Sequence, residues 1–331
     1  MESKTGHLPS DEEEFLIDES GGISSLPIST SIPSTLIPSI PILSIPIPSI
    51  PIPFISSIPS IPSIIQDQGS GFDGMIIDED EKDKPVSDDE IESILDRIGE
   101  DWTLKKIVSD MIPPGWGDVF SDLDAEFTLL NGILVNKEKT KGRWYPFKRN
   151  VFRLFWYIRP EQVKVVIFAM DPYYTTDNDG LPTAQGIAFM SRKGAKVPHS
   201  LNRMYTELAQ EYGDKFEKPY HGDLRYWVKQ GVFLINASLT VQPNEAGSHK
   251  KIWQPMLGKV IRRINKNPVM PIYMLWGNNA KEMKNFISSQ ATVLESNHPA
   301  AFGGFLGNGH FMKANEYLVK NNLKPIDWNL R

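Results

Sequence analysis

Four short apolar runs constrain the fold of this chain more than any other feature. They are residues 163–168, 232–235, 271–275 and 292–296. Each has the length of a buried strand, and Pro160 and Pro172 bound the first run. Segments with apolar residues at helical spacing separate the runs, and strands that alternate with helices pair in parallel through crossover helices. The pattern predicts an α/β fold: a three-layer α/β/α sandwich with a central four-stranded, mainly parallel sheet.

An acid, an amide and an imidazole stand at the ends of these runs. Asp171 comes shortly after the first run, Asn236 directly follows the second, and His298 comes just past the fourth. Trp276-Gly277 holds the corresponding place after the third run. Open α/β sheets bind their ligands outside the carboxyl ends of the strands. These groups should therefore meet at one edge of the sheet, which indicates an active site rather than a plain scaffold.

Ordered structure should begin near Ser87. This serine and Glu90, three residues later, have the spacing of a capping box, and an apolar stripe at helical spacing follows them. A second helix is expected from Trp102 to Met111, before Pro113. Further helical patterns cover residues 200–211, 252–265, 279–288 and 312–321.

The amino-terminal part of the chain has a different composition from the rest. Residues 1–90 carry 17 acidic and 3 basic side chains, whereas residues 91–331 carry 24 acidic and 32 basic ones. Residues 23–65 are an uncharged tract of isoleucine, proline and serine. Its frequent prolines exclude a membrane helix and favour extended, mostly disordered chain. We therefore expect a disordered tail over residues 1–86 and one domain over residues 87–331, with the tail acting as a tether or, alternatively, as a docking segment for a partner.

Composition also limits the chemistry. The chain has no cysteine, which excludes disulfides, thiolate catalysis and cysteine-ligated zinc. Its histidines lack the spacing of metal ligands, so neither a metal nor a cofactor is expected. The start of the chain lacks the basic-then-apolar order of a secretory signal, and we expect an intracellular protein. The basic domain is compatible with a polyanionic partner, although ordinary surface lysines would explain the charge equally well.

Several motifs occur in the order seen in family 1 uracil-DNA glycosylases, which the chain resembles over roughly residues 100–331. The first, Ala-Met-Asp-Pro-Tyr-Tyr, matches the water-activating loop of that family, and His-Pro-Ala-Ala matches its catalytic histidine loop. The tail suggests a member from a large DNA virus. The matching segments are Ala169–Tyr174, Gly186–Met190, Pro198–Leu208, Gly231–Val241, Ser248–Lys250, Leu275–Gly277, His298–Ala301 and Gly304–Trp328.

The resemblance implies hydrolysis of the N-glycosidic bond of uracil in DNA by base flipping, which initiates base-excision repair. It gives Asp171 the role of positioning the attacking water and stabilising the cationic sugar. It gives His298 the role of donating a hydrogen bond to uracil O2 as a neutral imidazole. A surface histidine in a turn is the simpler interpretation of His298 without the family match.

The same resemblance assigns four residues to the uracil pocket. Phe189 would stack on the base, and Asn236 would read its N3–H and O4 edge. Tyr173 would exclude the methyl group of thymine, and the backbone of Met170 would contact O2. By themselves, the phenylalanine and tyrosine could equally be packing residues and Asn236 a cap at the strand end.

Contacts with DNA are assigned to Ser200, Ser248, His249 and Phe302. The chain departs from the family here, because Ala300 stands where a phosphate-binding serine is usual. The loop after His298 is also shorter, so Phe302 takes the place of a leucine wedge. These departures predict weaker compression of the DNA backbone.

Two functions remain open at this point. The first is an active glycosylase, and the second is a DNA-binding accessory subunit of replication that keeps the fold with weak or no excision. In either case we expect a monomer that binds DNA and no membrane. It would act where DNA is replicated, in the nucleus or the cytoplasm, and its tail would contact a replication or repair protein.

Overall fold

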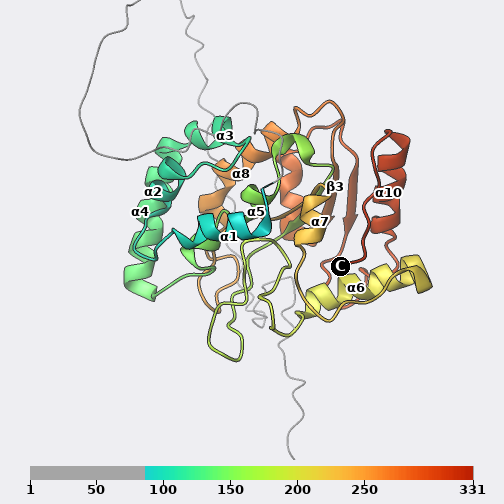
Figure 1. Cartoon of the computed structure of the whole chain (residues 1–331), viewed down its shortest axis with the longest axis horizontal. Helices are drawn as coiled ribbons and strands as arrows, with labels where there is room; N and C mark the ends of the chain where they lie inside the picture. Colours follow the sequence, from blue (N-terminus) through green and yellow to red (C-terminus); the bar gives the residue numbers. More distant parts are fainter. Residues whose placement is uncertain (1–85, 331) are drawn as a thin grey trace, which may run out of the picture. The chain divides into compact units, whose positions relative to one another are not determined.

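The centre of the domain is a four-stranded parallel sheet with flanking helices (Figure 1). The computed structural model describes residues 86–330, so the predicted disordered tail lies outside the described residues. The strands lie in the order β2-β1-β3-β4, and every pair is parallel, which confirms the predicted α/β sandwich. Their bounds are β1 Val165–Ala169, β2 Val232–Asn236, β3 Ile272–Trp276 and β4 Val293–Ser296.

The first helices follow the signals in the sequence. Helix α1 (Asp88–Asp96) begins with the predicted capping box: the Ser87 N–H donates to Glu90 Oε2 at 2.8 Å, and the Glu90 N–H donates to Ser87 Oγ at 3.2 Å. Helix α2 (Leu104–Asp110) starts two residues later than expected, because the Thr103 side chain caps it.

The sequence pattern did not reveal the long helix α4 or the short helices α3, α5 and α7. The predicted helix over residues 279–288 is instead a short α-helix, α9, followed by a 3-10 turn, η5. Helix α4 has 18 residues, yet no predicted helix covered it. The bounds are α3 Gly117–Ser121, α4 Asp124–Lys141, η2 Lys148–Asn150, α5 Arg153–Tyr157, η3 Pro160–Gln162, α6 His199–Tyr212, η4 Gly213–Lys215, α7 Arg225–Lys229, α8 Lys250–Ile264, α9 Asn278–Lys281, η5 Glu282–Phe286 and α10 His310–Lys320.

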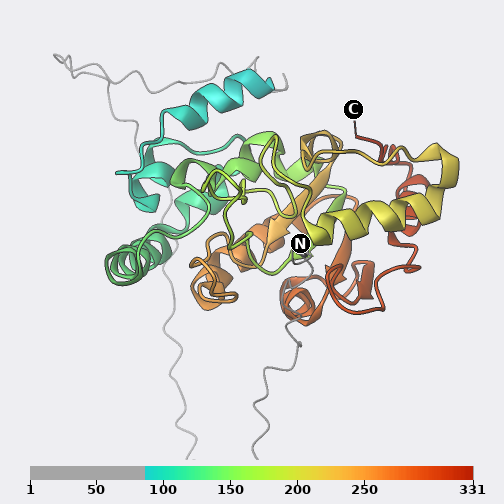
Figure 2. The ribbon, with the colours of Figure 1, turned by 90° about the horizontal axis from the view of Figure 1, so that it is seen from below.

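Two pairs of helices lie at opposite ends of the sheet. Helices α2 and α4 lie together at one end, and α6 and α10 lie together at the other (Figures 1 and 2). No helix in the described part of the chain is both long and apolar enough to cross a membrane.

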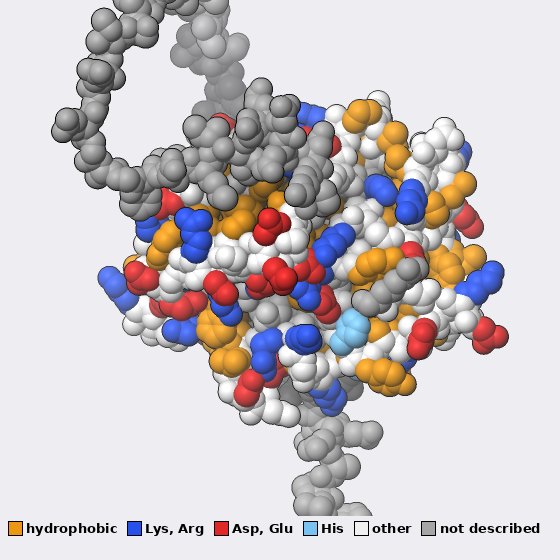
Figure 3. Space-filling model, viewed as in Figure 1, with side chains coloured by type: hydrophobic (Ala, Val, Ile, Leu, Met, Phe, Trp, Pro, Cys, Tyr) orange, Lys and Arg blue, Asp and Glu red, His pale blue; other side chains and the backbone are white. Residues whose placement is uncertain are grey.

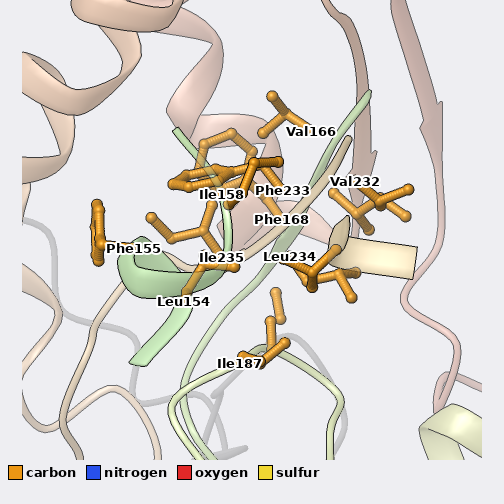
Figure 4. Close-up of a cluster of buried hydrophobic side chains, with 14 of the residues drawn as sticks. Leu154, Phe155, Ile158, Val166, Phe168, Ile187, Val232, Phe233, Leu234 and Ile235 are labelled. Atoms are coloured by element: carbon orange, nitrogen blue, oxygen red, sulfur yellow. The ribbon is translucent and has the colours of Figure 1, made fainter. Parts of the chain in front are cut away.

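The core is apolar and strongly aromatic. All residues of β1, β2 and β3 are buried, as expected for parallel strands that are covered on both faces. Side chains of α5 and the residues after it pack against β1 and β2, with Phe155 edge-on to Phe233 at a centroid distance of 5.7 Å (Figure 4). This packing holds the strands rigidly, so the loops at their carboxyl ends start from fixed positions.

Candidate active site

The carboxyl ends of the strands bring the predicted acid, amide and imidazole to one edge of the sheet. Ala169 and Asn236 are direct neighbours in the β1–β2 register, so Asp171 begins its loop beside the end of β2. His298 comes two residues after β4, whose last residue pairs with the end of β3. The Ser238 N–H donates to the Met170 carbonyl at 3.1 Å, which ties the first two loops together.

Asp171 is a partly buried carboxylate with one hydrogen-bonded oxygen and one oxygen that lacks a partner among the described residues. Its Oδ2 accepts a hydrogen bond from the Gly247 N–H. Its Oδ1 is buried and has no hydrogen-bond partner within residues 86–330. Burial raises the pKa of Asp171 to about 6, while the Gly247 N–H and the charge of Lys250 act in the opposite direction. At neutral pH the group is therefore mostly ionised and can hold a water molecule or a positive charge through Oδ1.

His298 is a neutral imidazole with a defined tautomer. The Ala300 N–H donates to Nδ1 at 3.1 Å, so this nitrogen carries no proton. Burial lowers the pKa of His298 to about 4, and the ring is neutral at physiological pH. The single ring proton then resides on Nε2, where it can be donated to a substrate oxygen.

An aromatic wall lies beside His298. The ring centroids of Phe189 and His298 are 6.2 Å apart, and their planes differ by 29°. Phe189 has a φ of +64°, a left-handed conformation that is unusual for a bulky residue and is found mostly at functional sites. The Tyr173 hydroxyl holds this conformation by donating to the Phe189 carbonyl at 3.0 Å. Burial raises the pKa of Tyr173, which keeps that donor protonated.

Asn236 completes the set with an unused acceptor. Its side chain is 5% exposed, and its Oδ1 is buried with no hydrogen-bond partner in the described part of the chain. A buried amide oxygen without a partner is costly in a folded protein. Its position at the end of β2 fits an acceptor reserved for a ligand better than a cap for the strand.

Comparison with known proteins identifies the family. The model of the uracil DNA glycosylase superfamily matches residues 155–319. The uracil-DNA glycosylase of Francisella philomiragia is 38% identical over 222 residues, which are 65% of this chain and 99% of that protein. This chain belongs to the uracil-DNA glycosylase family. The enzyme of that name from Francisella tularensis subsp. novicida is 42% identical over 222 residues, which cover 65% of this chain and 98% of that protein.

Solved structures of the family agree with the fold. The crystal structure of mimivirus uracil-DNA glycosylase superposes with a TM-score of 0.62 and 28% identity, over 72% of this chain and 93% of that chain. A variant of mimivirus UNG in complex with UGI gives a TM-score of 0.63 at 28% identity, over 68% of this chain and 90% of that chain. The family resemblance predicted from the motifs is thus confirmed.

The side chains that were assigned to DNA contacts differ from one another in exposure and in hydrogen bonding. Ser200 lies in the first turn of α6 and is 8% exposed, and Ser248 Oγ accepts from the Gln242 N–H at 2.8 Å. Phe302, in the loop after His298, is 97% exposed, and its role as a wedge stays a prediction.

His249, to which a contact with DNA was assigned, is buried in the free protein. It is 1% exposed, and its Nδ1 lies 2.9 Å from Thr240 Oγ1, which also accepts from the Trp253 indole at 2.8 Å. The buried ring cannot reach a phosphate in this conformation. It packs inside the loop that carries Gly247, so its position is that of a support for the loop.

Two residues of the site act through their backbones and were missed by reasoning from side chains. Gly247 anchors Asp171, and Ala300 fixes the tautomer of His298. Gly247 has a φ of +73°, a conformation that favours glycine, and a glycine next to the matched segment Ser248–Lys250 was the only hint in the sequence. Among the described residues, no group of three or more acidic or histidine side chains is arranged to hold a metal ion.

Proposed function

We propose that this protein hydrolyses the bond between uracil and deoxyribose in DNA and so begins base-excision repair. The observation that carries the proposal is the pair of protonation states at one edge of the sheet, an ionised Asp171 and a neutral His298 that can donate through Nε2. The family relatives support the same reaction. Water supplies a hydroxyl to C1′ of the sugar and a proton to the departing base, and the products are free uracil and an abasic site.

Access to the bond requires base flipping, because the target atom is hidden inside the duplex. Phe189 then offers a ring face, and stacking on an aromatic side chain contributes about 1–3 kcal/mol per base. Asn236 Oδ1 accepts the N3–H of uracil, whereas cytosine has an acceptor at that position and would leave the buried oxygen unpaired. Tyr173 closes the side of the pocket where thymine carries its methyl group.

Bond cleavage separates charge between a cationic sugar and an anionic base. Asp171 holds the water through Oδ1, which has no other hydrogen-bond partner among the described residues, and stabilises the cation by its negative charge. His298 donates from Nε2 to uracil O2, where negative charge develops, and the backbone N–H of Met170 faces the same oxygen. A neutral donor suits this role because it need not transfer its proton completely.

The remaining contacts position the DNA. Ser200 and Ser248 bind phosphates, and Phe302 fills the gap in the duplex after the uracil has left the stack. The alternative of a replication accessory subunit without excision is not favoured, since the chain keeps the acid, the imidazole, the amide and the aromatic wall together.

The test is release of free uracil from an oligonucleotide that contains a single uracil. The full-length protein should release uracil and leave thymine and cytosine in place. Removing a positioned proton donor costs about 10²–10⁴-fold in rate, and His298→Ala should lose that much activity. His221→Asn, in another loop, keeps an acceptor for the Asp223 N–H and should remain fully active. Tight DNA binding by the wild type without uracil release would instead support the accessory-subunit function.

The setting and partners of the reaction are part of the same proposal. The protein acts as a monomer inside the cell, wherever DNA is replicated, and residues 1–86 tether it or dock it to a replication or repair protein. Comparing uracil release by the full chain and by a chain that starts at Ser87 tests whether the acidic tail lowers activity. Equal rates would remove self-inhibition from the possible roles of the tail.

A further inference from the structure

The carboxyl end of α4 carries three exposed cations, Lys139, Lys141 and Arg143, which we call the α4 patch. Cations in the last turn of a helix stabilise its negative end, and this accounts for the two lysines. It does not account for Arg143, which lies beyond Gly142 at the end of the helix. The Arg143 guanidinium stands over the ring of Phe147, 5.6 Å from its centroid, which directs an exposed charge from a fixed position.

The α4 patch is fastened to the loop that supports the catalytic acid. The buried Gln242 side chain donates to the carbonyls of both Lys141 and Gly142 at 3.1 Å. Next to it, Tyr145 and Val241 exchange two backbone hydrogen bonds of 2.9 Å. The same loop continues to Gly247, whose N–H binds Asp171. The position of the cations relative to the active site is therefore set by the fold.

The patch also lies on the same side of the domain as the site. The end of α4 points to the lower edge of Figure 1, where the loops of residues 170–197 and the start of α6 also lie, and Lys and Arg side chains occur among acidic ones along the lower left rim in Figure 3. The charge of Lys141, one member of the patch, reaches the supporting loop. Burial lowers the pKa of His249 to about 4, and the charges of Lys141 and of the neighbouring Lys137 act in the same direction, while the charge of Glu245 opposes them.

We propose that the α4 patch is a second phosphate-binding surface, which holds the DNA backbone several nucleotides away from the flipped uracil. The separation follows from the chain: Lys141 contacts Glu245, two residues before Gly247, so the patch lies on the order of 15 Å from Asp171. The duplex rises by about 3.4 Å per nucleotide along its axis, so a separation of this size corresponds to about four nucleotides. The inference rests on DNA being the substrate.

The ion pair between Lys141 and Glu245 does not prevent this contact. Its Nζ–Oε2 distance is 2.7 Å, and both side chains are 46% exposed. Exposed pairs of this kind are weak in water and are screened by salt. A phosphate can therefore replace the carboxylate of Glu245, and the lysine exchanges one anionic partner for another.

The test compares a long and a short substrate. The full-length protein with Lys139, Lys141 and Arg143 all replaced by alanine should lose about tenfold in kcat/KM on a uracil-containing duplex of about 20 base pairs at low salt. Each lost phosphate contact should also make the logarithmic salt dependence shallower by about 0.9. On a single-stranded oligonucleotide of about four nucleotides, which is too short to reach the patch, the variant should match the wild type.

The control variant also loses three positive charges, but at the edge of the sheet where the strands begin. Lys266, Lys320 and Lys324 are exposed, and the Lys324 carbonyl accepts from Lys164, which directly precedes β1. Their replacement by alanine should leave the salt dependence on the long duplex unchanged. An equal loss in both triple variants, an unchanged salt dependence in the α4 variant, or an equal loss on the long and short substrates would overturn the inference.

Failure of the proposed glycosylase function can be distinguished from failure of the phosphate-binding role of the α4 patch. If the wild type released no uracil from either substrate, the enzymatic role would fail, and fluorescence anisotropy of a labelled duplex would still decide the role of the α4 patch. The α4 variant should then bind more weakly than the control variant and with a shallower salt dependence. Equal binding of the two variants would contradict the phosphate-binding role of the α4 patch, whether or not the protein releases uracil.

Discussion

Replacing Asp171 with asparagine should abolish uracil release and at the same time stabilise the fold. Asparagine has the same shape and keeps an oxygen for the Gly247 N–H, but it cannot carry the negative charge that the reaction needs. Burial raises the pKa of Asp171 to about 6 from an ordinary value of 3.8, so the folded protein disfavours the ionised form. The negative charge that catalysis requires therefore destabilises the folded protein, as is common at active sites.

The size of this cost follows from the displacement of the pKa. One unit corresponds to about 1.36 kcal/mol, so a carboxyl group displaced by about two units lowers the free energy of unfolding by about 3 kcal/mol at neutral pH. Partial exposure of the side chain reduces this to about 2 kcal/mol. Because the folded state binds the proton more tightly than the unfolded chain, the cost is complete above pH 6 and shrinks as the pH falls toward 3.8.

Urea denaturation of the wild type and of Asp171→Asn measures the effect. At about pH 7.5 the variant should be more stable by about 2 kcal/mol, and at about pH 4.5 only about one third of this difference should remain. The exposed Asp214→Asn is a matched control that should change stability by less than about 0.5 kcal/mol. A variant that is less stable than the wild type at pH 7.5, or a gain that does not depend on pH, would refute the reasoning, as would substantial uracil release by the variant.

Three further outcomes are expected. The kcat/KM for uracil release should fall about tenfold per pH unit below pH 6, as Asp171 gains its proton, whereas His298, with a pKa of about 4, should cause no change between pH 6 and 8. Phe302→Ala should lower release from duplex DNA by about tenfold and leave release from single strands unchanged, because a wedge acts only where a duplex must be opened; equal effects on both would contradict this. Gly186→Ala should lower the free energy of unfolding by about 3 kcal/mol in urea denaturation, since φ is +79° and the new Cβ would lie 1.7 Å from the Asn150 carbonyl oxygen; a neutral result would contradict this packing.

The sequence was sufficient to predict the sheet and the residues at its edge, because short buried strands carry their own signal. Each predicted strand lies within about two residues of an observed one, and the capping box at Ser87 sets the start of α1 as expected. Asp171, Asn236 and His298 follow from these strand ends. Their chemical roles came from the family motifs, since a carboxylate after a strand has many possible functions.

Helix α4 was missed because its apolar face is poorly defined by the sequence. Phe127, Leu130 and Leu134 are buried at helical spacing, but Leu129 between them is 68% exposed. No side-chain hydrogen bond caps the start of the helix either. Contacts with α2 and α8 place this helix, and local pattern alone does not contain them.

The details that set the chemistry also depend on tertiary structure. The hydrogen bond to Asp171 and the tautomer of His298 come from backbone N–H groups, which every residue except proline possesses. The burial that raises one pKa and lowers the other is likewise a property of the folded domain. For the same reason, sequence motifs alone could not show that His249 lies inside its loop.

The most direct measurement is a crystal structure of Asp171→Asn bound to a duplex with a single uracil. The uracil should lie outside the helix and stack on Phe189, with His298 Nε2 within hydrogen-bond distance of O2 and Asn236 facing N3 and O4. A uracil that remains paired or stacked in the duplex, or that binds away from Phe189 and His298, would contradict the proposed mechanism.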